Sequence, residues 1–460
     1  MIPKKLIESA LGRAMRTGGD FAELYAEDTR SMNLSMMDGK VETAAGTRSR
    51  GAGIRVYNGL LSVYVYGNDI SEAGLMRLAE QAADAVGNLK GKDADITLIG
   101  SVCANIHPVK YLPTDVPGAR RVDLVKRAYA AAKDYSPGIT QVIVNLIGSE
   151  KDVFIANSEG LMLPDKRVRT RISMTSVAAG NGETQTGSES PGALKGFEFY
   201  DEIDVEQLAR DASKRAVTML HAENCPAGVM PVVMDGGFGG VIFHEACGHS
   251  LEATSVALGN GEFCGKLGQQ IASEKVTAYD DGTIPGEWGS TNVDDEGTPT
   301  TKLLLIENGI LRNYMIDRLN GRRMQMAPTG SARRQDYSFA PTSRMRNTYI
   351  AAGSDDEDEM IATMGDGLYC AKMGGGSVNP VTGEFNFAVS EGYLIRDGKI
   401  AKPVRGAALI GRGGETIMKI DRVGPNMTMA QGMCGSLSGS VPTNVGQPRI
   451  RISSMTVGGR

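Results

Sequence analysis

The sequence predicts an α+β protein, with an N-terminal mixed α/β region that contains antiparallel sheets and a C-terminal domain that is rich in antiparallel β-strands and barrel-like. Two observations support this class. Stretches of alternating apolar and polar residues are separated by Asn-Gly or Asp-Gly pairs, which favour tight turns between antiparallel strands. Between them lie stretches whose apolar residues recur at helical spacing. Short strand-like segments and glycines become more frequent after residue 225.

The length of 460 residues allows more than one domain. We expect an N-terminal α+β domain over residues 1–222, with two units of about 1–110 and 111–222 as a finer division. A C-terminal domain is expected over residues 223–460. The boundary is placed here because Cys225-Pro-Ala-Gly follows the last N-terminal helix and interrupts regular structure.

Composition narrows the class of protein. A net charge of -5 and a pI near 5.6 argue against a general binder of nucleic acid or of anionic membranes. The first sixteen residues are charged throughout and lack the apolar core of a signal peptide, and no run of 18 apolar residues follows. The six cysteines form no Cys-x-x-Cys pair. We therefore expect a reduced, cytoplasmic protein without direct nucleic-acid or membrane partners.

The first unit begins with an amphipathic helix over residues 1–16. Alternation over residues 21–66 predicts three or four strands, and residues 71–86 return to helical spacing before Gly87. The strands are separated by two turn pairs, Asp38-Gly39 and Asn58-Gly59.

The second unit repeats this mixture. Helices are expected near residues 117–134 and 204–220, and strands over residues 141–147, 152–157 and 166–177. The polar, Gly/Ser-rich residues 180–192 are expected to form a long exposed loop.

Three arginines in the last of these strands, Arg167, Arg169 and Arg171, alternate with Val168, Thr170 and Ile172. We expect them on a solvated face of a sheet, in preference to a basic strip that holds an acidic substrate or partner.

In the C-terminal half, Asn308-Gly309 and Asp397-Gly398 each separate apolar runs, which predicts further hairpins and a curved or barrel-like arrangement. Ser354 is expected to cap a helix, with Glu357 completing a capping box. The acidic residues 294–296 lack the spacing of a calcium loop, so turn or supporting roles are expected for them.

The stretch Val241–Ala253 reads Val-Ile-Phe-His-Glu-Ala-Cys-Gly-His-Ser-Leu-Glu-Ala, which places His244, Glu245 and His249 close together. An apolar run and a Gly-rich turn precede it, so a strand, a turn and a helix are expected. The histidines are five residues apart, and on a regular α-helix they would diverge by roughly 140°. A π-bulge brings residues five apart together, and Gly248 lowers its cost. This pattern therefore predicts a metal site.

A catalytic zinc site usually has three protein ligands and an open position for water, so a third ligand is needed. Cys247 lies within the same helix, and Cys434 lies between glycines in a distant loop. Spacing alone leaves both cysteines open as ligands.

The segment His244 to Glu252 resembles the His-Glu-x-x-x-His signature of the TldD/PmbA family of metalloproteases. The resemblance covers the half after about residue 225 and, more loosely, the earlier half. The other segments that carry it are Thr277-Ala-Tyr-Asp-Asp-Gly-Thr-Ile-Pro, Asp294-Asp-Glu-Gly-Thr-Pro, Leu305-Ile-Glu-Asn-Gly-Ile-Leu, Arg344-Met-Arg-Asn-Thr-Tyr, Gly432-Met-Cys-Gly, Val441-Pro and Val445-Gly-Gln-Pro.

The resemblance implies that His244, His249 and Cys434 hold Zn2+ and that Glu245 is the general base. It also implies a catalytic, TldD-type subunit, which forms a homodimer or pairs with a metal-free PmbA/TldE-type homologue. The expected activity is hydrolysis of unfolded or small peptides through a zinc-bound water that Glu245 activates.

The glycines before Val378 leave room for another backbone. We expect an extended peptide substrate to add here as a strand, in agreement with the resemblance. The residues of this segment are Gly374, Gly375, Gly376, Ser377 and Val378.

Two alternatives remain at this point. The first is a non-catalytic regulator, in keeping with the family's older description as a modulator of DNA gyrase, with a structural metal and Cys247 as a fourth ligand. The second is a metal-dependent amidase that acts on a small molecule.

Overall fold

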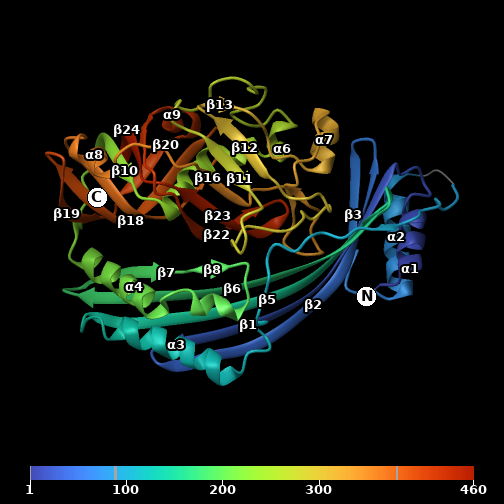
Figure 1. Ribbon diagram of the computed structural model, residues 1–460, viewed down its shortest axis with the longest axis horizontal. Helices are drawn as coiled ribbons and strands as arrows, with labels where there is room; N and C mark the ends of the chain where they lie inside the picture. Colours follow the sequence, from blue (N-terminus) through green and yellow to red (C-terminus); the bar gives the residue numbers. More distant parts are fainter. Residues whose placement is uncertain (1, 88–90, 380–381, 460) are drawn as a thin grey trace.

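A long, curved antiparallel sheet forms the N-terminal half of the protein in the computed structural model, which describes residues 2–87, 91–379 and 382–459 (Figure 1). The spatial order of its main strands is β3-β2-β1-β5-β6. These strands are β1 (Phe21–Met37), β2 (Lys40–Asn58), β3 (Leu61–Gly67), β5 (Ile139–Asn157) and β6 (Leu161–Gly180). Three short strands pair with β6, namely β4 (Ile99–Gly100), β7 (Glu183–Glu189) and β8 (Gly192–Ala193).

Both predicted turns connect strands, but the second lies one residue later than predicted, because Asn58 is the last residue of β2 and the turn is formed by Gly59 and Leu60. Asp38 and Gly39 both have positive φ, 49° and 78°, as a two-residue turn of this type requires. Residues 21–66 form three strands, the lower of the two numbers expected. The predicted strands over residues 141–147 and 152–157 are two parts of one strand, β5.

All four predicted N-terminal helices are confirmed, and they cover one face of the sheet. Their apolar faces belong to two buried clusters that also contain even-numbered residues of β1, such as Leu24 and Leu34. Ser71 accepts a hydrogen bond from the Gly74 N–H at the start of α2. The helices are α1 (Lys4–Ala14), α2 (Glu72–Val86), α3 (Gly118–Lys133) and α4 (Val205–Leu220).

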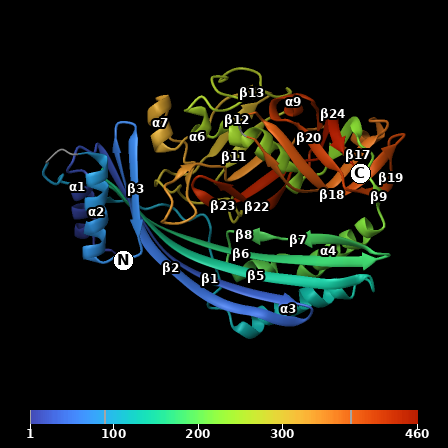
Figure 2. The ribbon, with the colours of Figure 1, turned by 180° about the vertical axis from the view of Figure 1, so that it is seen from behind.

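The opposite face of the sheet is concave and faces the C-terminal half (Figures 1 and 2). The predicted solvated face for Arg167, Arg169 and Arg171 is therefore wrong, because these side chains contact residues of the C-terminal half. The predicted loop over residues 180–192 is also wrong. It contains β7, which pairs with β6 through a turn at Asn181-Gly182.

Five strands of the C-terminal half close into a barrel, which confirms the barrel-like prediction. Each strand pairs with the next, and β18 pairs back with β17. They are β17 (Gly367–Val378), β10 (Gly228–Met234), β24 (Ile450–Gly458), β20 (Ala408–Arg412) and β18 (Glu384–Arg396). Three further strands belong to the same sheet, namely β9 (Glu223–Asn224), β19 (Lys399–Arg405) and β21 (Ile420–Val423).

A second C-terminal sheet of six strands lies between the barrel and the long sheet (Figure 1). In spatial order its strands are β13 (Ile310–Leu311), β12 (Lys302–Glu307), β11 (Ala278–Asp281), β16 (Asn347–Ile350), β23 (Gly439–Gln447) and β22 (Thr428–Ser436). A separate pair is formed by β14 (Ala332–Arg333) and β15 (Thr342–Ser343). The helices of this half are α5 (Val241–Phe243), α6 (Ala253–Val256), α7 (Arg318–Met324), α8 (Glu357–Ala362) and α9 (Gly413–Met418).

One predicted cap is wrong. Helix α8 begins two residues later than expected, and the carboxylate of Asp356, not the hydroxyl of Ser354, accepts hydrogen bonds from Asp358 and Glu359. A carboxylate is favoured at this position because it also interacts with the positive end of the helix dipole.

Buried ion pairs join the two halves. Arg55 of β2 pairs with Glu23 and with Glu296, and Arg167 pairs with Asp295. Two of the three acidic residues 294–296 thus pair with arginines, and the carboxylate of Asp294 accepts backbone hydrogen bonds, in agreement with the turn or supporting roles expected of them. We propose a domain boundary at 222/223, where α4 has ended and β9 joins the barrel sheet.

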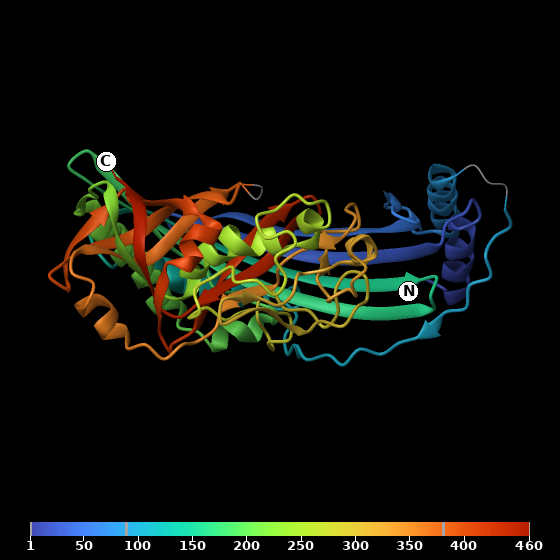
Figure 3. The ribbon, with the colours of Figure 1, turned by 90° about the horizontal axis from the view of Figure 1, so that it is seen from above.

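Helices α1 and α2 lie at the end of the long sheet away from the C-terminal half (Figure 3). Within the described residues, no helix is both long and apolar enough to cross a membrane.

Candidate metal centre

The predicted π-bulge is confirmed: residues His244–Gly248 form one π-helical turn directly after α5. Gly248 lies against the buried Met345, because a Cβ atom at position 248 would lie 2.2 Å from the Met345 sulfur. A side chain at this position would therefore require either the turn or the Met345 side chain to shift.

The turn brings two imidazoles to the thiol of Cys434 on β22. The Cys434 sulfur lies 3.4 Å from His244 Nε2 and 3.3 Å from His249 Nε2. The two rings are nearly perpendicular, with their centroids 5.1 Å apart. One potential ligand atom from each of the three residues lies within 4.8 Å of the other two. Strand β22, which carries Cys434, is an edge strand of the six-stranded sheet.

The charges around Cys434 favour the thiolate, which is the form that binds metals. Burial opposes ionisation of this thiol, but the positive charges and hydrogen bonds of His244 and His249 outweigh it and lower the pKa of Cys434 to about 3. Burial likewise disfavours the charged form of His249, but Glu252 and Cys434 raise its pKa well above the usual value.

Glu245 lies at the open side of this group. Its Oε2 is 3.6 Å from His249 Nε2, and its side chain is about a quarter exposed, at 23%, whereas the Cys434 residue is 7% exposed. A carboxylate placed beside the ligands and reachable by water can exchange protons with a reacting water molecule.

Two further residues support the site and were not assigned roles from the sequence. Glu252 Oε2 lies 3.2 Å from His249 Nδ1, and a carboxylate in this position orients an imidazole ligand. Arg344, fully buried, lies 3.8 Å from Glu252 and donates a hydrogen bond to the Cys434 carbonyl. Arg344 thereby connects the residue that contacts His249 with the backbone of Cys434. In the sequence, the only indication of a role for Arg344 was its position at the start of Arg344-Met-Arg-Asn, one of the segments that carry the family resemblance.

Cys247 has a different environment. It is fully buried in the apolar core of the C-terminal half, and burial raises the pKa of its thiol well above the usual value. Among the described residues, the group of potential ligands contains Cys434 and not Cys247. A closed site with both cysteines has no support in this geometry.

The segment predicted to bind substrate, Gly374–Val378, forms the end of β17. It pairs with β18 along one edge, whereas the pairing of β17 with β10 stops at Cys370. Gly374 and Gly375 line a cavity of about 570 Å³ together with the Gly-rich turn of residues 236–239. Side chains at Gly374 and Gly376 would collide with β18, so these glycines permit the close pairing.

The three residues fit a zinc ion. Tetrahedral Zn2+ with imidazole and thiolate ligands holds its ligand atoms about 3.6 Å apart, given bond lengths of about 2.1 and 2.3 Å. The sulfur-to-nitrogen separations of 3.3 and 3.4 Å are close to this value. Two nitrogens and one sulfur also match the ligand types that zinc prefers.

Known proteins resemble the chain along most of its length. Sequence models of the PmbA/TldA metallopeptidase family match domain 1 at residues 22–86, the central domain at 111–220 and the C-terminal domain at 227–459. The "Metalloprotease TldD homolog" of Haemophilus influenzae is 35% identical over 96% of this chain and 93% of its own length. A "Metalloprotease" of Methanothermobacter thermautotrophicus is 33% identical over 96% of both.

Solved structures share the fold. TldE from Thermococcus kodakarensis superimposes with a TM-score of 0.74 at 18% identity, over 99% of this chain and all of its own. A protein of Thermotoga maritima described as a proposed modulator of a DNA gyrase gives a TM-score of 0.78 at 19% identity, over 95% and 96%. At these identities the likeness concerns the fold alone, while the sequence matches above establish the relationship: the chain belongs to the PmbA/TldA metallopeptidase family.

Proposed function

We propose that the protein is a zinc metallopeptidase that hydrolyses unfolded or small peptides, with His244, His249 and Cys434 as ligands of Zn2+. The observation that carries this proposal is the convergence, within the described residues, of three potential ligand side chains with Glu245 beside them. Three ligands leave a fourth position open, as catalytic zinc sites require. The chemistry that Zn2+ supplies in such a site is Lewis acidity, which polarises a carbonyl and makes a water molecule easier to deprotonate.

Three side chains near the proposed ligands have distinct roles in this proposal. Glu245 accepts the proton of the attacking water and returns it to the leaving amine, because it is the carboxylate nearest to the ligands on their exposed side. Glu252 holds the His249 ring through Nδ1, which leaves Nε2 directed at Cys434. Arg344 holds the Cys434 backbone and Glu252 together.

We further propose that the substrate binds as an added strand at Gly374–Val378. Support comes from the edge of this segment that faces away from β18, where pairing with β10 has stopped. The adjoining cavity of about 570 Å³ gives room for side chains of the peptide. Backbone pairing of this kind selects an extended peptide and depends little on its sequence.

The proposed assembly is a dimer, with a second copy or with a metal-free homologue of the TldE type, and the proposed location is the cytoplasm. The exposed part of β2 supports a partner: residues 40–50 are all exposed, and within the described chain their outer edge has no pairing strand. Such an edge readily pairs with another chain. The six cysteines are free thiols, as in a reducing compartment.

The test is zinc content and peptide cleavage for two variants. Glu245→Gln should retain zinc but lose cleavage of an unfolded peptide by about a hundredfold or more, because a general base is removed. Cys434→Ser should lose both zinc and cleavage. Glu415→Gln, on the exposed surface of α9, is the matched control and should behave as wild type.

Cleavage that persists in Glu245→Gln would contradict the assigned base. A wild-type protein that binds zinc tightly but cleaves no unfolded peptide, alone or with its homologue, would instead favour the regulator with a structural metal. A protein active only on small amides would favour the amidase.

A further inference from the structure

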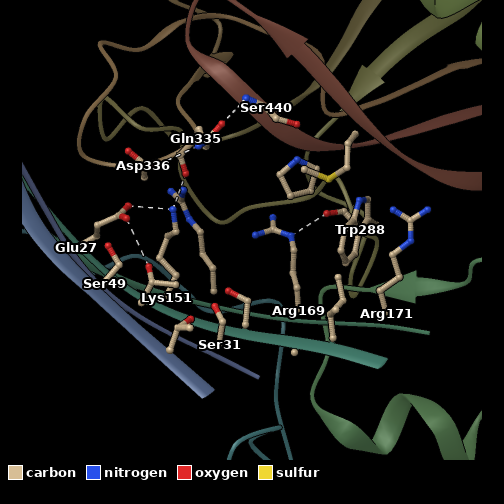
Figure 4. Close-up of a pocket in the computed structure, with 18 of the residues that line it drawn as sticks. Glu27, Ser31, Ser49, Lys151, Arg169, Arg171, Trp288, Gln335, Asp336 and Ser440 are labelled. Atoms are coloured by element: carbon tan, nitrogen blue, oxygen red, sulfur yellow. Dashed lines mark hydrogen bonds and ion pairs between the residues drawn. The ribbon is translucent and has the colours of Figure 1, made fainter. Parts of the chain in front are cut away.

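A cavity lies between the concave face of the long sheet and the C-terminal half (Figure 4). Its volume is about 710 Å³, within the usual range of small-molecule sites. Its floor is made by side chains that point to the same face of β2, β1, β5 and β6. One row across these strands consists of Thr47, Ser31, Ser149 and Arg169, each directly opposite the next.

Cationic side chains predominate in the lining. Lys151, Arg167, Arg169, Arg171, Arg333 and Arg334 face three carboxylates, those of Glu27, Asp295 and Asp336. Three of the six cations are already neutralised: Lys151 pairs with Glu27, Arg167 with Asp295, and Arg334 with Glu23.

The other three cations have no carboxylate within ion-pairing distance among the residues that the structure describes. Arg169 donates only to the carbonyls of Trp288 and Ser290. Arg171 donates to Ser190 and to the Gln431 carbonyl, and Arg333 bonds to carbonyls and a hydroxyl. Burial and neighbouring arginines lower the pKa of Arg169 to about 9, in keeping with an uncompensated charge. Excess positive charge in an enclosed site favours an anionic ligand.

Two of the uncompensated arginines, Arg169 and Arg171, flank Trp288 at one end of the cavity, whereas Glu27 and Asp336 lie at the other end (Figure 4). The hydroxyls of Ser31, Thr47 and Ser149 form the nearby floor and have no protein hydrogen-bond partner within the described part of the chain. Trp288 and Met433 add an apolar wall. Guanidinium groups, free hydroxyls and an apolar wall together suit an anion with an apolar part.

We propose that this cavity binds a small organic anion, whose carboxylate or phosphate group lies between Arg169 and Arg171 and whose apolar part lies against Trp288. The site is separate from the metal centre. Met433 lines the cavity, and Cys434, the next residue of β22, points to the other face of that strand. The proposal therefore does not depend on zinc or on peptide hydrolysis.

Trp288 is the only tryptophan in the chain, so its fluorescence reports directly on the cavity. The full-length protein is titrated with phenyl phosphate, with 3-phenylpropionate and, as the uncharged control, with 3-phenylpropionamide. We expect saturable binding of at least one anion, with an affinity that falls as salt is added and is at least about tenfold higher than that of the amide. The anion that binds identifies the ligand group as phosphate or carboxylate.

Two variants locate the site. Arg169→Gln and Arg171→Gln should each weaken anion binding by about tenfold or more, because each removes a charge-assisted hydrogen bond. Arg77→Gln on α2, which is 57% exposed, is the matched control and should leave binding unchanged. If Arg169→Gln does not fold, Arg171→Gln, which is half-buried, decides the outcome.

A carboxylate introduced by mutation at the site provides a second test, with the melting temperature as its measurement. Ser149 lies directly opposite Arg169, so Ser149→Glu should abolish anion binding and raise the melting temperature above that of Ser149→Gln. The proposal is overturned if neither anion binds, if the amide binds equally well, or if both arginine variants bind like wild type.

Discussion

Glu252 lies outside the proposed set of zinc ligands and contacts one of its members. Its carboxylate contacts His249 Nδ1 and is 4% exposed, so no water replaces it easily. We predict that Glu252→Gln lowers zinc affinity by about 10- to 100-fold, because the imidazole loses its charged anchor. Competition with a chelator of known affinity measures this change.

Glu262→Gln is the matched control for this prediction. Glu262 accepts a hydrogen bond from the Gly414 backbone and does not contact either imidazole. The zinc affinity of Glu262→Gln should equal that of wild type. If Glu252→Gln also binds zinc with wild-type affinity, His249 does not need the Glu252 carboxylate to orient its ring.

His107 gives a pH-dependent prediction at the same scale. Its residue is 4% exposed and its Nδ1 accepts a hydrogen bond from the Gly286 N–H. Burial and the positive charge of Arg169 lower its pKa from 6.5 to about 4. Between these values the unfolded chain binds a proton that the folded protein does not, so the stability contributed at neutral pH is lost as the pH falls from about 6.5 to 4.

Urea unfolding at several pH values measures this loss, with a slope of up to about 1.4 kcal/mol per pH unit from one proton. His107→Asn retains a hydrogen-bond acceptor without a titrating ring, so its stability should vary less over this range. The same pH dependence in both proteins would assign the effect to other groups.

The sequence indicates the residues of the proposed metal site more clearly than the residues that position them. His244, Glu245 and His249 lie within six positions, so their spacing is visible, while the choice of Cys434 over Cys247 came from the resemblance. Arg344 and Glu252 come together only through tertiary packing, 92 positions apart, and neither has a spacing that marks a role.

At the scale of elements, the π-helical turn depends on Gly248. We predict that Gly248→Ala destabilises the protein by about 1 to 3 kcal/mol, because its Cβ would overlap the sulfur of Met345 at 2.2 Å. It should also weaken zinc binding, since the overlap moves His249 relative to His244. Urea unfolding of the metal-free protein separates the first effect from the second.

Gly375→Ala is the matched control, because nothing lies within 4 Å of a Cβ at this position. A loss of stability equal to that of Gly248→Ala would mean that the effect comes from the backbone of any glycine. Unchanged stability in Gly248→Ala would mean that Met345 moves away at little cost.

Elements with strong local signals were predictable and polar elements were not. The turns at Asp38-Gly39, Asn308-Gly309 and Asp397-Gly398 all adopt the positive φ angles that these residues tolerate. Strand β7 was missed because its sequence, Glu-Thr-Gln-Thr-Gly-Ser-Glu, has no apolar alternation. It is a strand because the neighbouring β6 offers a free edge, and that is a tertiary cause.

At the scale of the whole molecule, the surface between the two halves was the least predictable feature. Arg167, Arg169 and Arg171 have the alternation of a solvated sheet face, and only the fold shows that another domain covers them. Charged residues are normally exposed, so a local pattern of arginines favours the wrong answer. The acidic segment of residues 294–296 was ambiguous for the same reason.

The last prediction concerns the buried ion pairs that join the halves. Arg55 is 1% exposed and bridges Glu23 of the long sheet and Glu296 of the C-terminal half. Arg55→Met should lower the free energy of unfolding by about 3 to 5 kcal/mol, because it leaves the buried carboxylate of Glu296 without its cation, whereas Glu23 keeps its pair with Arg334. Arg48→Met removes a surface ion pair from the same strand and should lower the free energy of unfolding far less than Arg55→Met, because solvent screens exposed charges.

A double variant tests whether the cost comes from the unpaired charge. Adding Glu296→Gln to Arg55→Met removes one uncompensated carboxylate, so the double variant should be more stable than Arg55→Met alone. If it is less stable, the arginine acts mainly through packing and through its hydrogen bond to the Pro341 carbonyl. Recovery of stability would show that the two halves are held together by charge compensation, since Arg55 and Glu296 belong to different halves and 241 positions separate them.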